Sequence, residues 1–295
     1  MPVSTTESVN SRSVGLDTLA PRNILSILLD GHIAAIGTVE KALAEVEAAA
    51  EAMARTVEAD GTIAYAAAGS SALMAMADSL ELPGTFGIPS DRVRIMIAGG
   101  VSSLSDLVGG TEDDAAQAAR DVAGIGPGDC IICVSASGRT PYTLAALRAA
   151  SKAGAMTLAI ANNPGAPLLD EAEIAILLST PPEIVAGSTR LGAATAQKAA
   201  LNMMSTLMAV RLGHIHDGHM INLRADNDKL RRRARRIVSE LGGCDEDTSG
   251  RMLEQSGGSV KHAILLAIGV PDMDRAGELL AHNQGNLRRA LASLA

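Results

Sequence analysis

Three hydroxyl side chains lie close together in the segment Ser135–Pro141, which reads Ser-Ala-Ser-Gly-Arg-Thr-Pro. The segment follows an apolar run over residues 130–134 and precedes a helical pattern over residues 142–150. Proline favours the first position of a helix, and a helix N-terminus attracts anions through its unpaired N–H groups and its dipole. The sequence therefore predicts a phosphate-binding loop; the alternative is an ordinary turn in which Ser137 or Thr140 caps the helix.

A second segment of the same kind begins near Gly69. The apolar run 62–67 ends at Ala-Gly-Ser-Ser, residues 68–71, and a helical pattern continues to Leu80. Two such strand–loop–helix units indicate a parallel sheet whose carboxyl ends share a ligand crevice. Gly69 and Gly138 match neither the P-loop nor the dinucleotide fingerprint, so a phosphorylated small metabolite is favoured over a nucleotide.

Two glutamates between the loops could transfer protons. Glu81 is expected to end the helix that follows the first loop, and Glu112 to open a helix over residues 112–123. Each has a simpler interpretation, because a carboxylate at a helix end is usually exposed and one in a first turn complements the helix dipole. Taken singly, neither glutamate identifies a catalytic site.

The elements that would position these residues follow from hydrophobic periodicity. Near-continuous apolar strands alternate with helices in the middle of the chain, which is typical of a doubly wound α/β layer covered on both faces. The expected strands are 62–67, 93–98, 129–134, 156–161 and 173–178, and the expected helices between them are 71–80, 112–123 and 141–153.

Helical patterns predominate on both sides of that layer. One runs from Pro21 to Val57, is interrupted near Gly31 and Gly37, and is expected to pack outside the sheet. A long helix over 189–212 is followed by shorter ones, in which two glycine–polar pairs precede apolar helices and suggest an interaction module. The expected shorter helices are 223–241, 246–256, 259–268, 271–281 and 285–294.

The composition excludes several classes of protein. The chain has 295 residues, 47% of them hydrophobic, and only three aromatic residues. Proteins that bind single strands or bases stack them on aromatic rings, and a formal charge of −8 also disfavours nucleic acid. The basic run 229–236 is therefore interpreted as a solvated helix face. Without a span of about 20 apolar residues or a signal peptide, a cytoplasmic protein with no membrane partner is expected.

Neither the cysteines nor the histidines form a convincing metal or redox site. Cys130 and Cys133 lie three apart in a predicted strand, which would place them on opposite faces. His214, His216 and His219 could gather a metal ion on a loop, but no nearby cysteine or carboxylate set completes a site. No metal and no cofactor are therefore expected.

The motifs taken in order resemble those of the N-acetylmuramic acid 6-phosphate etherases. The match covers nearly the whole chain, so it is specific. Its segments are Thr6-Glu7, Gly69-Ser70-Ser71, Glu81 to Gly87, Ala98-Gly99-Gly100, Glu112-Asp113-Asp114, Ser135 to Pro141, Asn163-Pro164-Gly165, Gly187 to Leu191, Thr195 to Lys198 and Asn227 to Leu230.

The resemblance implies the sugar isomerase (SIS) fold, in which a parallel sheet between helices binds a phosphosugar and a small helical C-terminal domain follows. It also implies a homodimer. The expected division is an N-terminal leader and helix over 1–57, an SIS domain over 58–222 and a helical domain over 223–295.

The resemblance further implies a lyase that cleaves the D-lactyl ether of N-acetylmuramic acid 6-phosphate during cell-wall recycling, without metal or redox cofactor. Glu81 would be the proton donor, kept neutral by burial, and Glu112 the base, ionised by nearby donors. The residues that would bind the phosphorylated amino sugar are Gly69, Ser70, Ser71, Ser135, Ser137, Gly138, Arg139, Thr140, Ser188 and Arg190.

The chain departs from the family pattern at four positions. Val9, Leu73 and Gly192 stand where the pattern has cations, and Asn222 where it has an aspartate. A related phosphosugar therefore stays open as the substrate, for a lyase or an isomerase. A sugar-phosphate-binding regulator without catalytic activity is the other alternative, although a pure sensor has no need for both glutamates.

Overall fold

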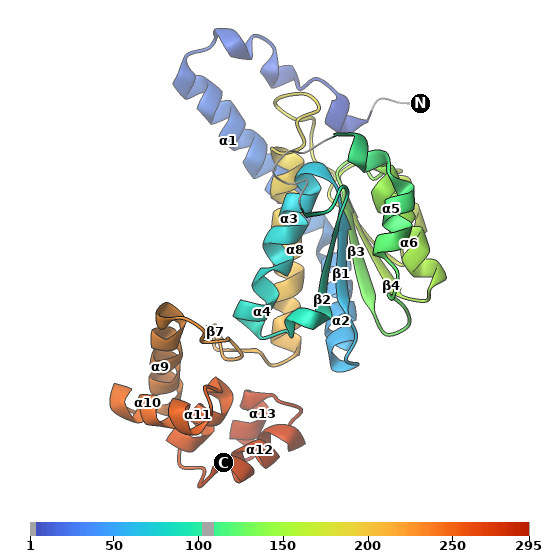
Figure 1. The fold of residues 1–295 in the computed structure, drawn as a ribbon. Helices are drawn as coiled ribbons and strands as arrows, with labels where there is room; N and C mark the ends of the chain where they lie inside the picture. The colour runs from blue at the N-terminus through green and yellow to red at the C-terminus, as the bar shows by residue number, and fades with distance from the viewer. Residues whose placement is uncertain (1–3, 102–108, 295) are drawn as a thin grey trace. The chain divides into compact units, whose positions relative to one another are not determined.

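The computed structural model describes residues 4–101 and 109–294 (Figure 1). The chain divides by its internal contacts into two compact units. The first contains residues up to Ser79 and Asp91–Ser205, and the second contains Leu80–Ser90 and the residues from Thr206 onward. The expected three-part division at residues 57 and 222 stays a prediction.

A five-stranded parallel sheet in the order β2-β1-β3-β4-β5 forms the centre of the first unit. In the register, Ile63 lies between Val93 and Cys130, and the carboxyl ends of the strands meet at one edge. The predicted α/β fold is thereby confirmed. The strands are β1 (Ile63–Ala67), β2 (Val93–Ile97), β3 (Cys130–Ser135), β4 (Met156–Ala161) and β5 (Ile174–Leu177).

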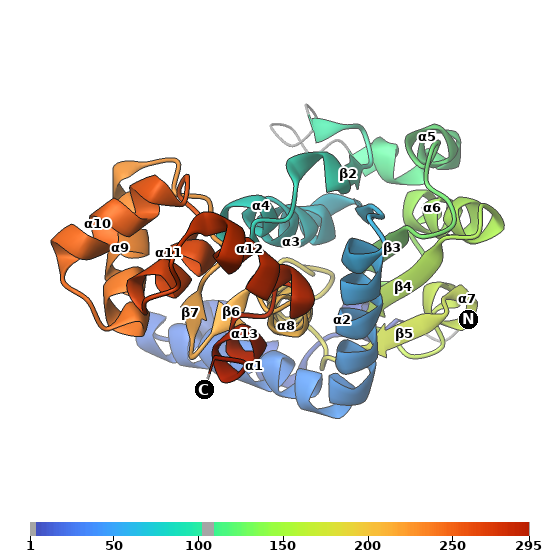
Figure 2. The ribbon, with the colours of Figure 1, turned by 90° about the horizontal axis from the view of Figure 1, so that it is seen from below.

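Helices cover both faces of this sheet, as Figures 1 and 2 show. One face packs against α5 (Ala115–Asp121), α6 (Pro141–Lys152) and α7 (Pro167–Glu171) through a core of small and branched aliphatic side chains. The other face carries α2 (Leu43–Glu58), α3 (Gly69–Ser79) and the first part of α8 (Gly192–Arg211). Strands buried on both faces explain the near-continuous apolar runs in the sequence.

The N-terminal helical pattern breaks once, not twice. α1 (Pro21–Gly37) is continuous through Gly31, whose missing side chain leaves room for Ile184, since a Cβ there would lie 2.8 Å from the Ile184 side chain. A 3₁₀ segment, Thr38–Ala42, then leads to α2. The prediction of an interruption at Gly31 is therefore wrong, because close packing explains this glycine.

The second unit is mainly helical. It contains α4 (Glu81–Phe86) and a two-stranded hairpin of β6 (Ile215–His216) and β7 (His219–Met220), neither of which periodicity predicted. Pro83 and Gly84 interrupt the helical pattern of α4, and strands of two residues are too short to give a pattern at all. The remaining helices are α9 (Asp228–Gly242), α10 (Glu246–Gln255), α11 (Val260–Ala267), α12 (Met273–His282) and α13 (Leu287–Ala292), which enclose one aliphatic core.

Helices α10 to α13 form two similar pairs, α10 with α11 and α12 with α13. Asp245 and Asp272 each cap the first helix of a pair by accepting a bond from the backbone N–H three residues later. Left-handed residues 257–258 and 284–285 then lead to the second helix of each pair. The two glycine–polar pairs seen in the sequence thus occupy equivalent positions in a structural repeat. Over the described residues, no helix is both long and apolar enough to span a bilayer.

Candidate functional site

The loop after β3 is held by its own hydroxyl groups. Ser135 is almost fully buried, and its Oγ lies 2.8 Å from Thr140 Oγ1 and accepts a bond of 3.0 Å from the Gly138 N–H. Ser137 Oγ accepts from the Arg139 N–H at 3.1 Å. These bonds within the loop fold the five residues after the strand into a compact turn.

The same loop leaves the N-terminus of α6 uncapped. Pro141 occupies the first turn, and no side chain of the cap residue Thr140 bonds to the helix backbone. The alternative in which Thr140 caps the helix is therefore wrong, because its hydroxyl pairs with Ser135. Gly138 is required in the turn, since it has φ +63° and a Cβ there would lie 2.4 Å from the Cβ of Ala166. Unpaired N–H groups at a helix start can bind a phosphate.

The loop after β1 has a different construction. Gly69, with φ +54°, opens α3 directly at the end of the strand, and Ser70 and Ser71 follow in its first turn. Ser70 is partly exposed and Ser71 is buried, and neither hydroxyl bonds to another described residue. A Cβ at Gly69 would lie 2.6 Å from Oε1 of Glu112. The structure thus brings Glu112, predicted as the base, against the backbone of the first hydroxyl loop.

Glu112 is half-buried in a 3₁₀ turn, Gly109–Asp113, and does not open α5 as expected. α5 begins at Ala115 with Asp114 as its cap, because the Asp114 side chain accepts from the Gln117 N–H. Burial, and then the charge of Asp113, raise the pKa of Glu112. The raised pKa makes Glu112 a stronger proton acceptor once it is ionised, and its role as the base stays a prediction.

Glu81 belongs to the second unit. It is the first residue of α4, two residues after α3 ends, and it does not close the preceding helix as predicted. Its side chain is exposed, and Thr85 Oγ1 donates a hydrogen bond of 3.3 Å to its Oε2. The burial expected of a neutral proton donor is therefore absent.

A third loop carries Ser188 and Arg190, both predicted to bind the substrate. Ser188 is partly exposed, and Arg190 is exposed. The loop is closed by Glu183, a buried carboxylate that sequence analysis missed. Glu183 accepts bonds of 2.8 Å from the N–H groups of both Gly192 and Ala193 at the start of α8. A glutamate six residues before the predicted helix, and nine before its observed start, is too weak a signal to identify such a cap.

Two of the four departures from the family pattern have a structural reason. A Cβ at Gly192 would lie 3.1 Å from Oε2 of Glu183 and 3.2 Å from the Cβ of Ala35, so the position is crowded. Asn222 Nδ2 donates to the Phe86 carbonyl at 2.9 Å, a bond that an ionised aspartate cannot make. This bond secures the C-terminal end of α4. Val9 and Leu73 are exposed, and nothing in the structure explains them.

Asp78 is a second buried carboxylate that sequence analysis missed. It accepts hydrogen bonds from Tyr65 Oη at 2.9 Å and from Asn202 Nδ2 and Ser205 Oγ at 2.8 Å each. Burial raises its pKa, while these three bonds oppose that shift. Asp78 thereby ties α3, which starts with the first hydroxyl loop, to β1 and α8. Its partners are far away in sequence, so no local motif could reveal them.

The three neighbouring histidines have separate environments. His216 Nε2 lies 3.5 Å from Asp217, and His219 Nε2 lies 3.4 Å from Glu240. Burial, followed by the charge of Lys261, lowers the pKa of His214 to about 4. Among the described residues, no group of three or more histidine, cysteine, aspartate or glutamate side chains has the arrangement to hold a metal ion.

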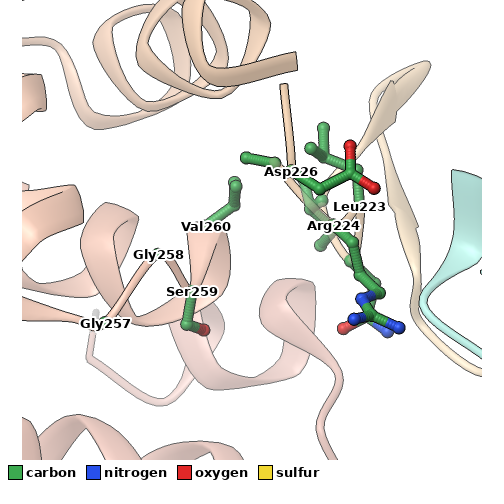
Figure 3. A pocket seen from close by; sticks show the side chains of 10 residues that line it. Leu223, Arg224, Asp226, Gly257, Gly258, Ser259 and Val260 are labelled. Carbon is green, nitrogen blue, oxygen red and sulfur yellow. The ribbon is translucent and has the colours of Figure 1, made fainter. Parts of the chain in front are cut away.

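One cavity of the second unit, about 480 Å³ in volume, lies between residues 221–226 and the start of α11 (Figure 3). Arg224 and Asp226 extend from one wall, and Ser259 and Val260 lie on the other. None of the residues predicted to bind substrate lines this cavity. The catalytic and binding residues predicted from the sequence therefore lie at the sheet edge and on α4, outside this cavity.

Two of the three loops at the sheet edge lie in a segment that matches a known domain, the SIS domain. The family model for the SIS domain matches residues 103–212, which include β3, β4, β5 and the loops that follow them. The fold is also similar to that of a phosphoheptose isomerase from Francisella tularensis, with a TM-score of 0.49 and 19% identity over 64% of this chain and 97% of that chain.

Relatives that match over nearly their full length then identify the family. The chain is 43% identical over 277 residues to the N-acetylmuramic acid 6-phosphate etherase of Deinococcus radiodurans, covering 93% of this chain and 91% of that protein. It is 38% identical over 288 residues to that of Geobacillus thermodenitrificans, covering 97% and 98%. The chain belongs to the N-acetylmuramic acid 6-phosphate etherase family, which confirms the resemblance found in its motifs.

Proposed function

We propose that this protein is a carbon–oxygen lyase that converts N-acetylmuramic acid 6-phosphate into N-acetylglucosamine 6-phosphate and D-lactate. Membership of the etherase family supports the reaction. The observation in this chain that supports the reaction is the position of Glu112. Its carboxylate lies against Gly69, in a loop with free serine hydroxyls. A proton acceptor beside a phosphate-binding loop meets the demand of an elimination from a phosphosugar.

In the proposed first step, Glu112 removes the C2 proton of the ring-opened sugar, which the C1 aldehyde acidifies. The electron pair forms the C2–C3 double bond as the C3–oxygen bond breaks. Glu81 gives its proton to the departing ether oxygen, and D-lactate leaves. Thr85 orients the Glu81 carboxyl through its hydrogen bond to Oε2.

In the second step, the Glu81 carboxylate takes a proton from a water molecule as the water oxygen adds to C3 of the unsaturated aldehyde, and a proton returns to C2, which gives N-acetylglucosamine 6-phosphate. Elimination and hydration together are redox-neutral, so the proposal needs no electron carrier. Protonated Glu112 is the group placed to return the proton, since it received one from C2 in the first step.

The phosphate would be bound by the hydroxyl loops at the sheet edge. Ser70 and Ser71 offer free hydroxyls, and the uncapped start of α6 offers backbone N–H groups. Arg139 is anchored through Nη2 to the Gly165 carbonyl at 3.0 Å and keeps its positive charge near the second loop. The remaining residues proposed to bind substrate are Gly69, Ser135, Ser137, Gly138, Thr140, Ser188 and Arg190.

The deciding experiment is a D-lactate release assay with N-acetylmuramic acid 6-phosphate. The wild-type protein is expected to release D-lactate, and Glu81→Gln and Glu112→Gln to abolish release while keeping the fold. Glu58→Gln, which changes an exposed glutamate at the opposite end of β1, is the matched control and should be fully active. A folded wild-type protein that binds the phosphosugar but releases no lactate would contradict the proposal and favour a regulator or another substrate.

We also propose that the protein is a homodimer formed through α1. Leu25, Leu29 and Ile33 are 66%, 59% and 60% exposed and lie four residues apart, so they form one apolar stripe on this helix. Contiguous exposed apolar surface marks an interaction site, and a second copy of the chain presents the same stripe. Light scattering should report a dimer that Leu29→Asp dissociates. Ile268→Asp, an exposed position in the second unit, should leave it intact; a monomeric wild type would overturn the proposal.

A further inference from the structure

The N-terminal 3₁₀ turn Thr5–Glu7 is attached to the substrate edge of the sheet by hydrogen bonds. The Gly187 N–H donates to the Thr6 carbonyl at 2.9 Å, and Asn163 Nδ2 donates to Thr6 Oγ1 at 3.2 Å. Thr6 is only 2% exposed although it is polar. A single 3₁₀ turn has little stability of its own, so these contacts fix its position.

The attachment joins two of the predicted binding loops. Asn163, two residues beyond the end of β4, also donates through Nδ2 to the Ala136 carbonyl at 2.9 Å, inside the hydroxyl loop after β3. Thr6 therefore connects that loop, through Asn163, with the loop of Ser188 and Arg190, through Gly187. Figure 1 shows the dark blue segment at the end of the sheet where β3 runs into its loop.

Glu7 follows the buried threonine and presents its carboxylate to the third loop. A Cβ at Gly187 would lie 3.1 Å from Oε2 and 3.8 Å from Oε1 of Glu7, so the carboxylate lies along the backbone next to Ser188. The side chain is exposed and forms no ion pair with a described residue. Both oxygens are therefore free to accept hydrogen bonds, in a place that the contacts of Thr6 keep fixed.

We propose that Glu7 is a specificity-determining residue that accepts a hydrogen bond from a hydroxyl or amide N–H of the bound phosphosugar. An ionised carboxylate only accepts hydrogen bonds, and it repels phosphate. Glu7 therefore selects the sugar end of the ligand, while the hydroxyl loops hold the phosphate. This inference rests on the proposed function, because it requires a phosphosugar at the sheet edge.

The first test compares Glu7→Gln with wild type in the lactate assay. Charge-assisted hydrogen bonds are among the stronger polar contacts, so KM should rise roughly tenfold or more while kcat changes little. Thr6→Val keeps Glu7 but removes the hydroxyl that Asn163 contacts, so it should raise KM by a smaller factor. Glu58→Gln should change neither constant.

The second test separates a ligand contact from damage to the loops. Calorimetry should show that Glu7→Gln weakens binding of N-acetylglucosamine 6-phosphate but does not weaken binding of inorganic phosphate. Unchanged binding of the sugar phosphate, or equal weakening of both ligands, would overturn the assignment of Glu7.

The two proposals fail in different ways. A wild-type protein that releases no D-lactate contradicts the proposed reaction, while the comparison of the two ligands still tests Glu7. A wild-type protein that binds inorganic phosphate but no sugar phosphate overturns both the reaction and the role of Glu7.

Discussion

The two hydroxyl loops of the first unit are constructed in opposite ways. In the loop after β3, the hydroxyls of Ser135, Ser137 and Thr140 bond within the loop, so its shape is set by its own side chains. In the loop after β1, the hydroxyls of Ser70 and Ser71 bond to no described residue. In that loop the Glu112 carboxylate lies close to Gly69. One loop is thus a turn held by its own hydroxyls, and the other leaves its hydroxyls without a bond to a described residue, beside the Glu112 carboxylate.

The largest effect is expected from Gly69→Ala. The new Cβ would lie 2.6 Å from Glu112 Oε1 at a residue with φ +54°, so the carboxylate must move. A displacement of about 1 Å at a catalytic group can reduce the rate roughly 100-fold, and kcat/KM for lactate release should fall by that order. Gly37→Ala, at a position with no atom within 4 Å of the new Cβ, should leave kcat/KM unchanged. Full activity of Gly69→Ala would show that Glu112 does not act from this position.

Gly138→Ala, in the second loop, should lower the free energy of unfolding. Its Cβ would lie 2.4 Å from the Cβ of Ala166 at φ +63°, whereas Gly165, with φ +64°, has open space around the same position. Overpacking costs about 1–3 kcal/mol, and a left-handed alanine about 1–2 kcal/mol. Urea unfolding should therefore show a larger loss of stability for Gly138→Ala than for Gly165→Ala. Equal losses would mean that the contact with Ala166 relaxes without strain.

Ser135→Ala tests the difference between the two loops through a smaller change in stability. It removes the bonds to Thr140 and to the Gly138 N–H, each worth about 1 kcal/mol, although that N–H keeps the Ser135 carbonyl as an acceptor. The melting temperature should therefore fall by a few degrees. Ser70→Ala should leave the melting temperature unchanged and weaken phosphosugar binding instead. A loss of stability in Ser70→Ala would show that the first loop is also built on its hydroxyls.

The smallest effect is a change in pH dependence. Burial, and then Asp113, raise the pKa of Glu112, so Asp113→Asn removes the second cause and should lower that pKa. A general base must be ionised, and the acidic limb of the kcat/KM profile should therefore move to lower pH, with the plateau unchanged. Because Asp113 is exposed, the displacement should shrink at high salt. An acidic limb at the same pH in both proteins would indicate that another group controls it.

Local sequence was a good guide where the pattern is long and repetitive. β4 has the predicted bounds, 156–161, and β1, β3 and α6 differ from theirs by one residue at one or both ends. The hydroxyl loops and Gly69 were identified because strand, glycine, serine and helix follow one another directly. α4 was missed because Pro83 and Gly84 interrupt its six residues, and the hairpin of β6 and β7 was missed because its strands have only two residues each.

The sequence by itself determined the parallel α/β class, the hydroxyl loops and the family, because alternating apolar runs and ordered motifs are properties of neighbouring residues. Only the tertiary structure decided that Glu112 lies against Gly69, that Glu183 caps α8, and that the Thr6 turn presents Glu7 beside Gly187. Such contacts join residues from 9 to about 180 positions apart. No local propensity encodes them, since they depend on which strand ends meet at the same edge of the sheet.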